Sequence, residues 1–286
     1  MQKAQELVVR SINDLTERHG FGPMASLRPP EFQLFSLNDD PDGLWVAEAG
    51  GEIIGCAFSW VSGDLWFLAE LFVSPEHQGR GIGNQLLARA FEHASKAGVR
   101  NKALITFTFN TASQGLYMRN GLFPRLPIYF FRTATPVGRA PGDELRHSDI
   151  ANTAAHRERL VQIDASSLGV SRAKHHGYLL NDSSTRGVFL HAEDDCVGYA
   201  YVSSSGHIGP LAVSRPDAMS AAFRTALNLA VAAETSQISA FLPGVNDAAL
   251  RVAVQHGMRI TFPMVLVSAH DFGDWTRYLP RNPGFM

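Results

Sequence analysis

The sequence has little cysteine and lacks any long hydrophobic run. No apolar stretch approaches the roughly 20 residues that span a bilayer, and residues 1–10 are charged and lack the apolar core of a signal peptide. The two cysteines, Cys56 and Cys196, lie far apart in strand-like segments, and no Cys/His spacing resembles a zinc site. We therefore expect a cytoplasmic protein with two free buried thiols, no metal and no membrane partner.

Neither sign of charge is in excess. The 286 residues carry 25 Lys and Arg against 27 Asp and Glu, so the formal net charge is -2. A nearly neutral chain produces no global basic field, and we expect no nucleic acid partner. The neighbouring His175 and His176 would point in different directions on a helix, so we interpret them as part of a solvated helix face rather than as metal ligands.

The chain repeats itself at an offset of about 140 residues, and its length suits two ordinary domains. The motif at 71–74 returns at 211–214, a hairpin-like segment at 45–55 returns at 188–198, and the segment 110–121 returns at 246–257. The order is the same in both halves, which chance explains poorly. We predict a first domain at 1–133, a linker rich in proline, glycine and small residues at 134–143, and a second domain at 144–286.

Each half combines strand and helix patterns, which indicates an α+β fold. The first half opens with an amphipathic helix whose apolar face includes Leu7, Val8, Ile12 and Leu15. It has no counterpart of the segment 144–150, so an opening strand is either absent or lost by truncation or an alternative start codon. The other expected elements are strands at 44–49, 52–61, 65–73 and 102–109, helices at 82–97 and 111–120, and a closing pair of strands around 122–132.

Three glycines, Gly79, Gly81 and Gly83, alternate between the end of an apolar strand and the start of a helix. Glycine tolerates positive φ and leaves its backbone N–H unshielded. With the helix dipole behind them, such groups form a site for an anion such as pyrophosphate, and Arg80 adds a charge. A flexible loop or a simple helix start stays the alternative. No Walker lysine follows, and no regular βαβ unit supports a dinucleotide fingerprint.

The surrounding sequence resembles the acetyl-CoA motif of the GNAT superfamily of N-acetyltransferases. That motif is a strand, then Gln/Arg-x-x-Gly-x-Gly/Ala, then a helix, and residues 78–83 fit it at every position. Residues 110–123 resemble the family's Asn-x-x-Ala-x-x-Leu-Tyr-x-x-x-Gly-Phe, with Ser113 in place of the alanine. The resemblance covers most of 1–132 and, more loosely, 144–270. It implies two tandem domains, each with a mixed, mostly antiparallel central sheet flanked by helices.

By this resemblance the chain is an acetyl-CoA-dependent N-acetyltransferase that acetylates a primary amine of unknown identity. Backbone groups at 71–73 would pair with the pantetheine arm like an added strand, and the amides of 79–84 would hold the pyrophosphate. The implied cofactor-binding residues are Leu71, Phe72, Val73, Gln78, Gly79, Arg80, Gly81, Ile82, Gly83, Asn84, Asn110 and Ser113.

Two side chains are candidates for proton transfer. Glu70 lies next to the expected thioester site and would accept the amine's proton, directly or through water. The alternative is an ordinary strand charge paired with an arginine. Tyr117 would protonate the leaving thiolate, or else it anchors the short helix on the sheet. The backbone N–H of Val73 would polarise the thioester carbonyl, and the segment 18–23 is a candidate wall of the acceptor pocket.

The second half does not repeat these residues. At the same offset the three glycines fall on Met219, Ala221 and Phe223, and Glu70 falls on Pro210. We therefore expect a degenerate GNAT-like second domain that keeps the fold without the chemistry. A non-catalytic acetyl-CoA sensor is the alternative function, and a longer acyl donor is a third. A homodimer stays open, because the sequence does not decide the oligomeric state.

Overall fold

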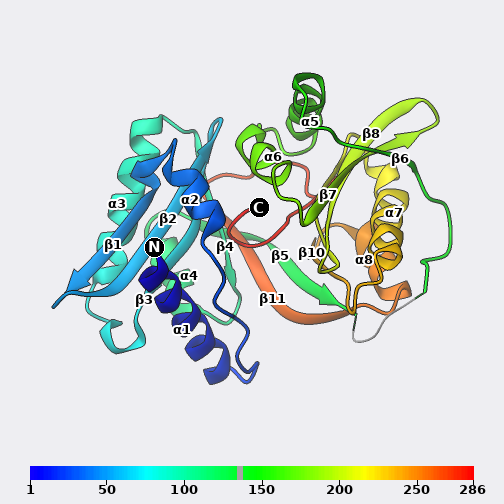
Figure 1. Ribbon diagram of the computed structural model, residues 1–286. Coiled ribbons are helices and arrows are strands. Elements are labelled where there is room, and N and C mark those ends of the chain that lie inside the picture. The colour runs from blue at the N-terminus through cyan, green and yellow to red at the C-terminus, as the bar shows by residue number, and fades with distance from the viewer. Residues whose placement is uncertain (134–137) are drawn as a thin grey trace. The chain divides into compact units, whose positions relative to one another are not determined.

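The computed structural model describes residues 1–133 and 138–286, which form two compact units (Figure 1). Unit 1 contains residues 1–124 and 267–270, and unit 2 contains residues 125–266 and 271–286. In each unit, helices pack on strands that are mostly antiparallel, so the predicted α+β fold is confirmed. Over the described residues, no helix is long and apolar enough to cross a membrane.

Unit 1 places helices on both faces of its sheet. It contains α1 (Gln2–Arg18), α2 (Glu31–Leu37), β1 (Leu44–Ala49), β2 (Glu52–Ser62), β3 (Leu65–Val73), α3 (Ile82–Ala97), β4 (Asn101–Phe107) and α4 (Thr111–Arg119). Strand β2 pairs antiparallel with β1 and β3, and β4 joins β3 in parallel. Gly55 faces Leu86 of α3, whereas the adjacent Cys56 packs against Leu7 and Val8 of α1. Because consecutive strand residues face opposite sides, α1 and α3 cover opposite faces.

Unit 2 repeats this order and adds strands. It contains β5 (Phe123–Arg132), β6 (Arg146–Asp149), α5 (Ala154–Ser167), α6 (Ala173–Leu179), β7 (Thr185–Ala192), β8 (Asp195–Ser203), β9 (His207–Val213), α7 (Met219–Ala232), β10 (Ser239–Pro243), α8 (Asp247–Gln255), β11 (Arg259–Ser268) and β12 (Tyr278–Leu279). The strand order is β11-β5-β10-β9-β8-β7-β6, and β12 pairs with β9. Helix α7 buries Met219, Phe223 and Leu227 in the core of this unit.

The sequence repeat is also a repeat of strand register. Gly55 pairs with Val73 between β2 and β3, and Gly198 pairs with Val213 between β8 and β9. Each half then continues with a helix and a strand parallel to the last one, β4 on β3 and β10 on β9. The two halves therefore share one fold, as their resemblance implied.

The compact units exchange short pieces of the two sequence halves. Strand β5, from the end of the first half, pairs antiparallel with β10 inside unit 2, where Ile128 faces Pro243. In unit 1, the Ala269 N–H donates to the Lys102 carbonyl at 2.9 Å. The predicted domain boundaries describe the sequence halves and stay a prediction. Of the predicted linker, residues 134–137 lie outside the described residues.

Most expected elements of the first half match the structure to within two residues, but two interpretations were wrong. The expected pair of strands around 122–132 is the single strand β5. His175 and His176 are fully buried on α6 and do not form a solvated face. The His176 ring bonds to Tyr201 and Asp164, and the His175 ring stands edge-on to Phe285. Both cysteines are free, as expected, with Cys56 buried and Cys196 half-buried.

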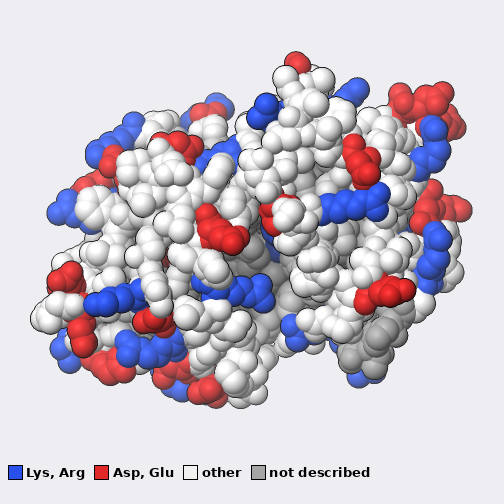
Figure 2. Space-filling model, in the orientation of Figure 1, with Lys and Arg blue, Asp and Glu red and all other residues white. Residues whose placement is uncertain are grey.

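The surface carries both signs of charge. Figure 2 shows Lys and Arg interspersed with Asp and Glu over the face in view. Several charged side chains of the described residues are paired, for example Arg89 with Glu92 at 3.1 Å and Lys96 with Asp42 at 2.9 Å. This mixed distribution matches the near-neutral net charge of the sequence.

Candidate functional site

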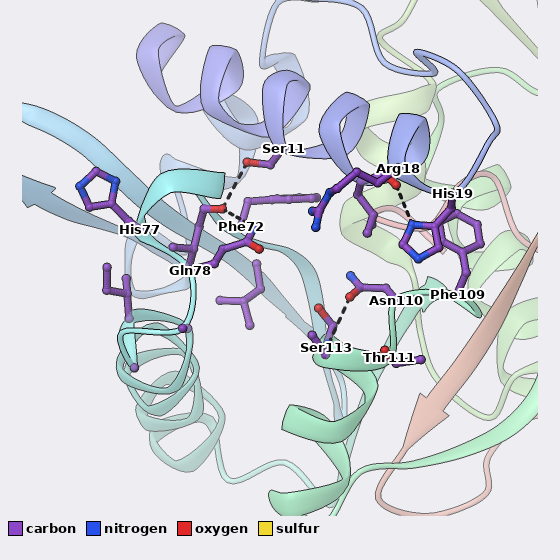
Figure 3. A pocket seen from close by; sticks show the side chains of 18 residues that line it. Ser11, Arg18, His19, Phe72, His77, Gln78, Phe109, Asn110, Thr111 and Ser113 are labelled. Carbon is purple, nitrogen blue, oxygen red and sulfur yellow. Dashed lines mark hydrogen bonds between the residues drawn. The ribbon is translucent and has the colours of Figure 1, made fainter.

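A pocket of about 320 Å³ opens in unit 1 between α1, the end of β3, the start of α3 and the β4–α4 junction (Figure 3). Ten of the twelve residues expected to bind the cofactor line it, and the exceptions are Arg80 and Asn84. The structure thus brings together the two motifs that the sequence singled out, although Gly83 and Asn110 are 27 positions apart in the chain. Their role in binding stays a prediction.

The glycine loop follows a short 3-10 turn, Pro75–His77, and leads into α3. Gly79 and Gly81 have φ of 76° and 82°, in the left-handed region that favours glycine. A β-carbon at either position would meet nothing within 4 Å, so both positions face open space. Gly81 is the N-cap of α3 and has no side chain to accept from the first N–H groups. This helix start therefore presents backbone donors at the edge of the pocket.

The edge of β3 opens into the same pocket. Its parallel register with β4 runs from Leu65 to Leu68, so residues 71–73 lie beyond that pairing. The Ser74 N–H donates to Ile54 at 2.9 Å, on the side of β2. Because successive N–H groups of a strand point to opposite edges, the Val73 N–H points away from β2 and into the opening. The Gln78 side-chain amide and the Ser11 hydroxyl donate to the Val73 carbonyl at 3.1 and 3.5 Å, and both side chains are labelled in Figure 3.

Asn110 caps α4 at the far wall of the pocket. Its side-chain oxygen accepts from the Ser113 N–H at 3.2 Å, as an N-cap residue should. Tyr117, one turn further along α4, is buried and does not line the pocket. Its hydroxyl bonds to the Ser113 side chain, and burial raises the pKa of this phenol. Tyr117 therefore stays protonated and reaches the pocket through Ser113.

Glu70 lies on β3 beneath α1 and α2 rather than in the wall of the pocket. Its carboxylate accepts from the Gln33 amide at 2.7 Å and from Gln5. Partial burial raises the pKa of this carboxyl, and the two amide bonds oppose that rise only in part. Its hydrogen-bond partners are thus neutral amides, not the arginine of the alternative interpretation. A carboxyl in this state is a stronger proton acceptor than an exposed one.

Sequence reasoning missed Ser11 and Leu15, which line the pocket from α1. Arg18, at the end of that helix, and His19 also line it, and both belong to the expected segment 18–23. His19 packs on Phe109 with ring centroids 4.9 Å apart. The contribution of the segment 18–23 to an acceptor pocket stays a prediction. The polar face of α1 looks like an ordinary solvated face in the sequence, so periodicity alone gives no signal for this role.

The corresponding region of unit 2 is built differently. Helix α7 begins at Met219, the position equivalent to Gly79, so the residues equivalent to the glycine loop lie inside a helix. Met219 and Phe223 are fully buried there. The position equivalent to Glu70 is Pro210, which has neither a carboxylate nor a backbone N–H.

Comparisons with known proteins agree with this geometry. Residues 10–122 match the family model described as "Acetyltransferase (GNAT) family". An uncharacterized N-acetyltransferase of Methanocaldococcus jannaschii is 35% identical over 92 residues, which are 30% of this chain and 41% of that protein. An acetyltransferase of Pectobacterium atrosepticum is 36% identical over 95 residues, 32% of this chain and 67% of that protein. The chain therefore spans less than half the length of the first relative.

A solved structure extends the similarity of fold to both halves. A tandem GNAT protein from the clavulanic acid biosynthesis pathway superposes with a TM-score of 0.59 at 17% identity. The superposition covers 94% of each chain. At this identity the likeness concerns the fold alone, and it supports a tandem arrangement.

Proposed function

Because the chain belongs to the acetyltransferase (GNAT) family, we propose that unit 1 binds acetyl-CoA in its pocket and acetylates a primary amine. One observation carries the proposal. The same pocket joins an uncapped helix start with positive-φ glycines to an open strand edge. The first fits a pyrophosphate, and the second fits a pantetheine arm that pairs with the strand.

The protein groups around the pocket supply the proton transfers. The amine attacks the thioester carbonyl, a new C–N bond forms, and the C–S bond breaks. Glu70 accepts the proton that the amine loses, through water because its carboxyl lies outside the pocket wall. The Val73 N–H donates to the carbonyl oxygen as negative charge develops there. The leaving thiolate takes a proton from the Ser113 hydroxyl, which Tyr117 replenishes.

A matched pair of glycine variants tests the cofactor site. Gly81 and Gly98 lie at the two ends of α3, both with positive φ and both with open space for a β-carbon. Gly81→Ala places a methyl group where the phosphate would approach, and we expect acetyl-CoA binding by calorimetry to weaken at least about tenfold. Gly98→Ala carries a similar backbone strain and should bind like the wild type. Equal binding by all three proteins would contradict this site.

A non-catalytic acetyl-CoA sensor is the second candidate. The observation that favours it is the position of Glu70 and Tyr117 outside the pocket wall. Release of CoA, detected with a thiol reagent against panels of amines, peptides and aminoglycosides, separates the two functions. Acetyl-CoA binding without CoA release from any panel would favour the sensor.

We further propose that unit 2 is a degenerate copy without a cofactor site. The helical start of α7 and the burial of Met219 and Phe223 support this, because they fill the place of a phosphate loop. The full chain should then bind one acetyl-CoA per molecule in a calorimetric titration. A stoichiometry of two would contradict the proposal.

A further inference from the structure

In unit 2, as at the pocket of unit 1, a strand continues beyond the residues that pair with its parallel neighbour. We call the opening beside these further residues the splay. The parallel register of β9 with β10 covers only His207 and Ile208, so residues 211–213 lie beyond it, as 71–73 do on β3. The Ser214 N–H donates to Val197 at 2.8 Å, on the side of β8. The Val213 N–H therefore points into the splay, as the Val73 N–H does in unit 1.

The chain's own segment fills this splay. Strand β12 pairs antiparallel with β9, with Tyr278 opposite Ala212 and Leu279 opposite Leu211. The Val213 N–H donates to the Arg277 carbonyl at 2.9 Å. The backbone groups of 211–213, which match 71–73 in the repeat, are thus engaged by residues 277–279 as by an added strand.

The same segment is also held by a side chain, that of Asn246. Asn246 is the counterpart of Asn110, and both cap the short helix after the parallel strand. The Asn246 oxygen accepts from the Ala249 N–H at 3.1 Å. Its amide nitrogen donates to the carbonyls of Trp275 and Thr276 at 3.2 and 3.0 Å. In unit 1 the equivalent Asn110 lines the pocket.

We propose that residues 275–279 are a built-in occupant of the second cleft, a peptide in the place of a pantetheine arm. The comparison with the arm rests on the proposed function of unit 1, whereas the occupancy stands on the contacts within unit 2. The segment makes hydrogen bonds with 211–213 and Asn246, whose counterparts 71–73 and Asn110 we expect to bind acetyl-CoA. Acetyl-CoA therefore has no room in unit 2 unless this segment leaves.

The occupant is anchored as part of the core rather than as an exchangeable lid. Trp275 is 4% exposed, and Tyr278 and Leu279 are fully buried. The buried guanidinium of Arg172 donates to the Tyr278 hydroxyl and lies over the Tyr278 ring, 5.5 Å from its centroid. Upstream, the Asp274 N–H donates to the Ser167 carbonyl at 2.7 Å. These anchors imply that the segment stabilises unit 2 in the absence of any ligand.

Amide hydrogen exchange on the wild-type protein tests the occupancy. Without ligand, the Val213 amide should exchange at least about 100-fold more slowly than the Val73 amide, because within the described residues only the former has a peptide acceptor, the Arg277 carbonyl. Addition of acetyl-CoA should slow Val73 and leave Val213 unchanged. Equal fast exchange at both sites without ligand would overturn the proposal. Protection of Val213 with no effect of acetyl-CoA on Val73 would support the occupant and count against the proposed function.

A matched pair of cap variants provides the second test. Asn246→Asp keeps the oxygen that caps α8 but turns the donor toward Trp275 and Thr276 into an acceptor. We expect it to lower Tm by roughly 5 °C or more and to leave acetyl-CoA binding within about twofold of wild type. Asn110→Asp makes the same change at the wall of the unit 1 pocket, and should weaken acetyl-CoA binding with little change in Tm. A Tm for Asn246→Asp equal to that of Asn110→Asp would overturn the proposed occupant.

Discussion

Replacing Glu70 with glutamine distinguishes the contribution of its carboxylate to catalysis from its effect on the stability of the fold. In the wild type, burial raises the Glu70 pKa above its ordinary value near 4.5. Glutamine keeps the oxygen that accepts from Gln33, and the Gln5 amide can rotate to meet the new NH2 group. The substitution therefore removes a titratable proton acceptor and little packing. We expect Glu70→Gln to lower kcat/KM by about 10²- to 10⁴-fold, the usual contribution of a general base.

The same substitution should make the fold more stable at neutral pH. Between the unfolded and the folded pKa of Glu70, the native state holds a proton that the unfolded state has released. The free energy of unfolding of the wild type therefore falls as pH rises through this window. The loss is about 1.4 kcal/mol per pH unit at most, and less where water reaches this partly exposed carboxyl. Glu70→Gln lacks this titration, so its stability relative to wild type should rise from pH 4 to pH 8.

The assays are a pH profile of kcat/KM with a thiol reagent and urea unfolding at several pH values. The wild-type rate should fall at low pH as Glu70 takes up a proton, and the variant should lose that limb. Glu76→Gln is the matched control, because Glu76 has a 62% exposed side chain beside the same loop. Its activity should stay at the wild-type level. Full activity of Glu70→Gln with an unchanged acid limb would refute the assignment of the base.

Three further substitutions test the acid and the packing behind the loop. Tyr117→Phe removes the hydroxyl bonded to Ser113 and should lower kcat about 100-fold. The KM for acetyl-CoA should stay within about twofold of the wild-type value. An unchanged kcat would mean that Tyr117 is an aromatic anchor only. Gly55→Ala brings a β-carbon to 2.9 Å from Leu86 of α3 and should lower the free energy of unfolding by about 1–3 kcal/mol in urea. Gly83→Ala, whose nearest neighbour is at 3.7 Å, should cost clearly less, and an equal cost would contradict this steric reasoning.

Local patterns predicted the strands and helices of the first half because each has its own signal. Strand β3 and helix α3 have the expected bounds, since alternation and helical periodicity act over a few residues. The single strand β5 was not predicted as one element, because its neighbours in the sheet, β10 and β11, both come from the second half of the chain. The nearer of them in sequence, β10, lies more than 100 residues further along, as the pair Ile128 and Pro243 shows. Nothing within 122–132 identifies it.

The burial of the histidines on α6 also could not be predicted from the local sequence. His176 is buried because Tyr201 and Asp164 bond both of its ring nitrogens, and Asp164 also accepts from Tyr199. These partners come from a strand and another helix, so the helix that carries His176 looks polar when taken alone. A network of this kind makes a polar side chain acceptable in a core, and only the tertiary structure reveals it.

The candidate site was predictable where chemistry and local structure coincide. The glycine loop and the Asn110 cap are short motifs whose residue types predict their local structure, a loop of positive φ before a helix and a helix N-cap. The α1 wall, the amides on Glu70 and the occupant at 275–279 each depend on segments that meet only after folding. The repeat predicted the loss of the second loop. It gave no hint of what would fill the cleft, because residues 275–279 have no counterpart in the first half.

The two helix starts explain why the loop and its ligand would be lost together. In unit 1 the 3-10 turn Pro75–His77 and α3 are separated by residues 78–81, and the first N–H groups of α3 have no side-chain cap. In unit 2 the turn Pro216–Ala218 runs directly into α7, and the Met219 N–H donates to the Pro216 carbonyl where an anion would otherwise accept. Reintroducing glycines at 219, 221 and 223 would therefore not recreate a cofactor site. The backbone N–H groups at the start of α7 would still bond within the chain, and residues 275–279 would still fill the splay.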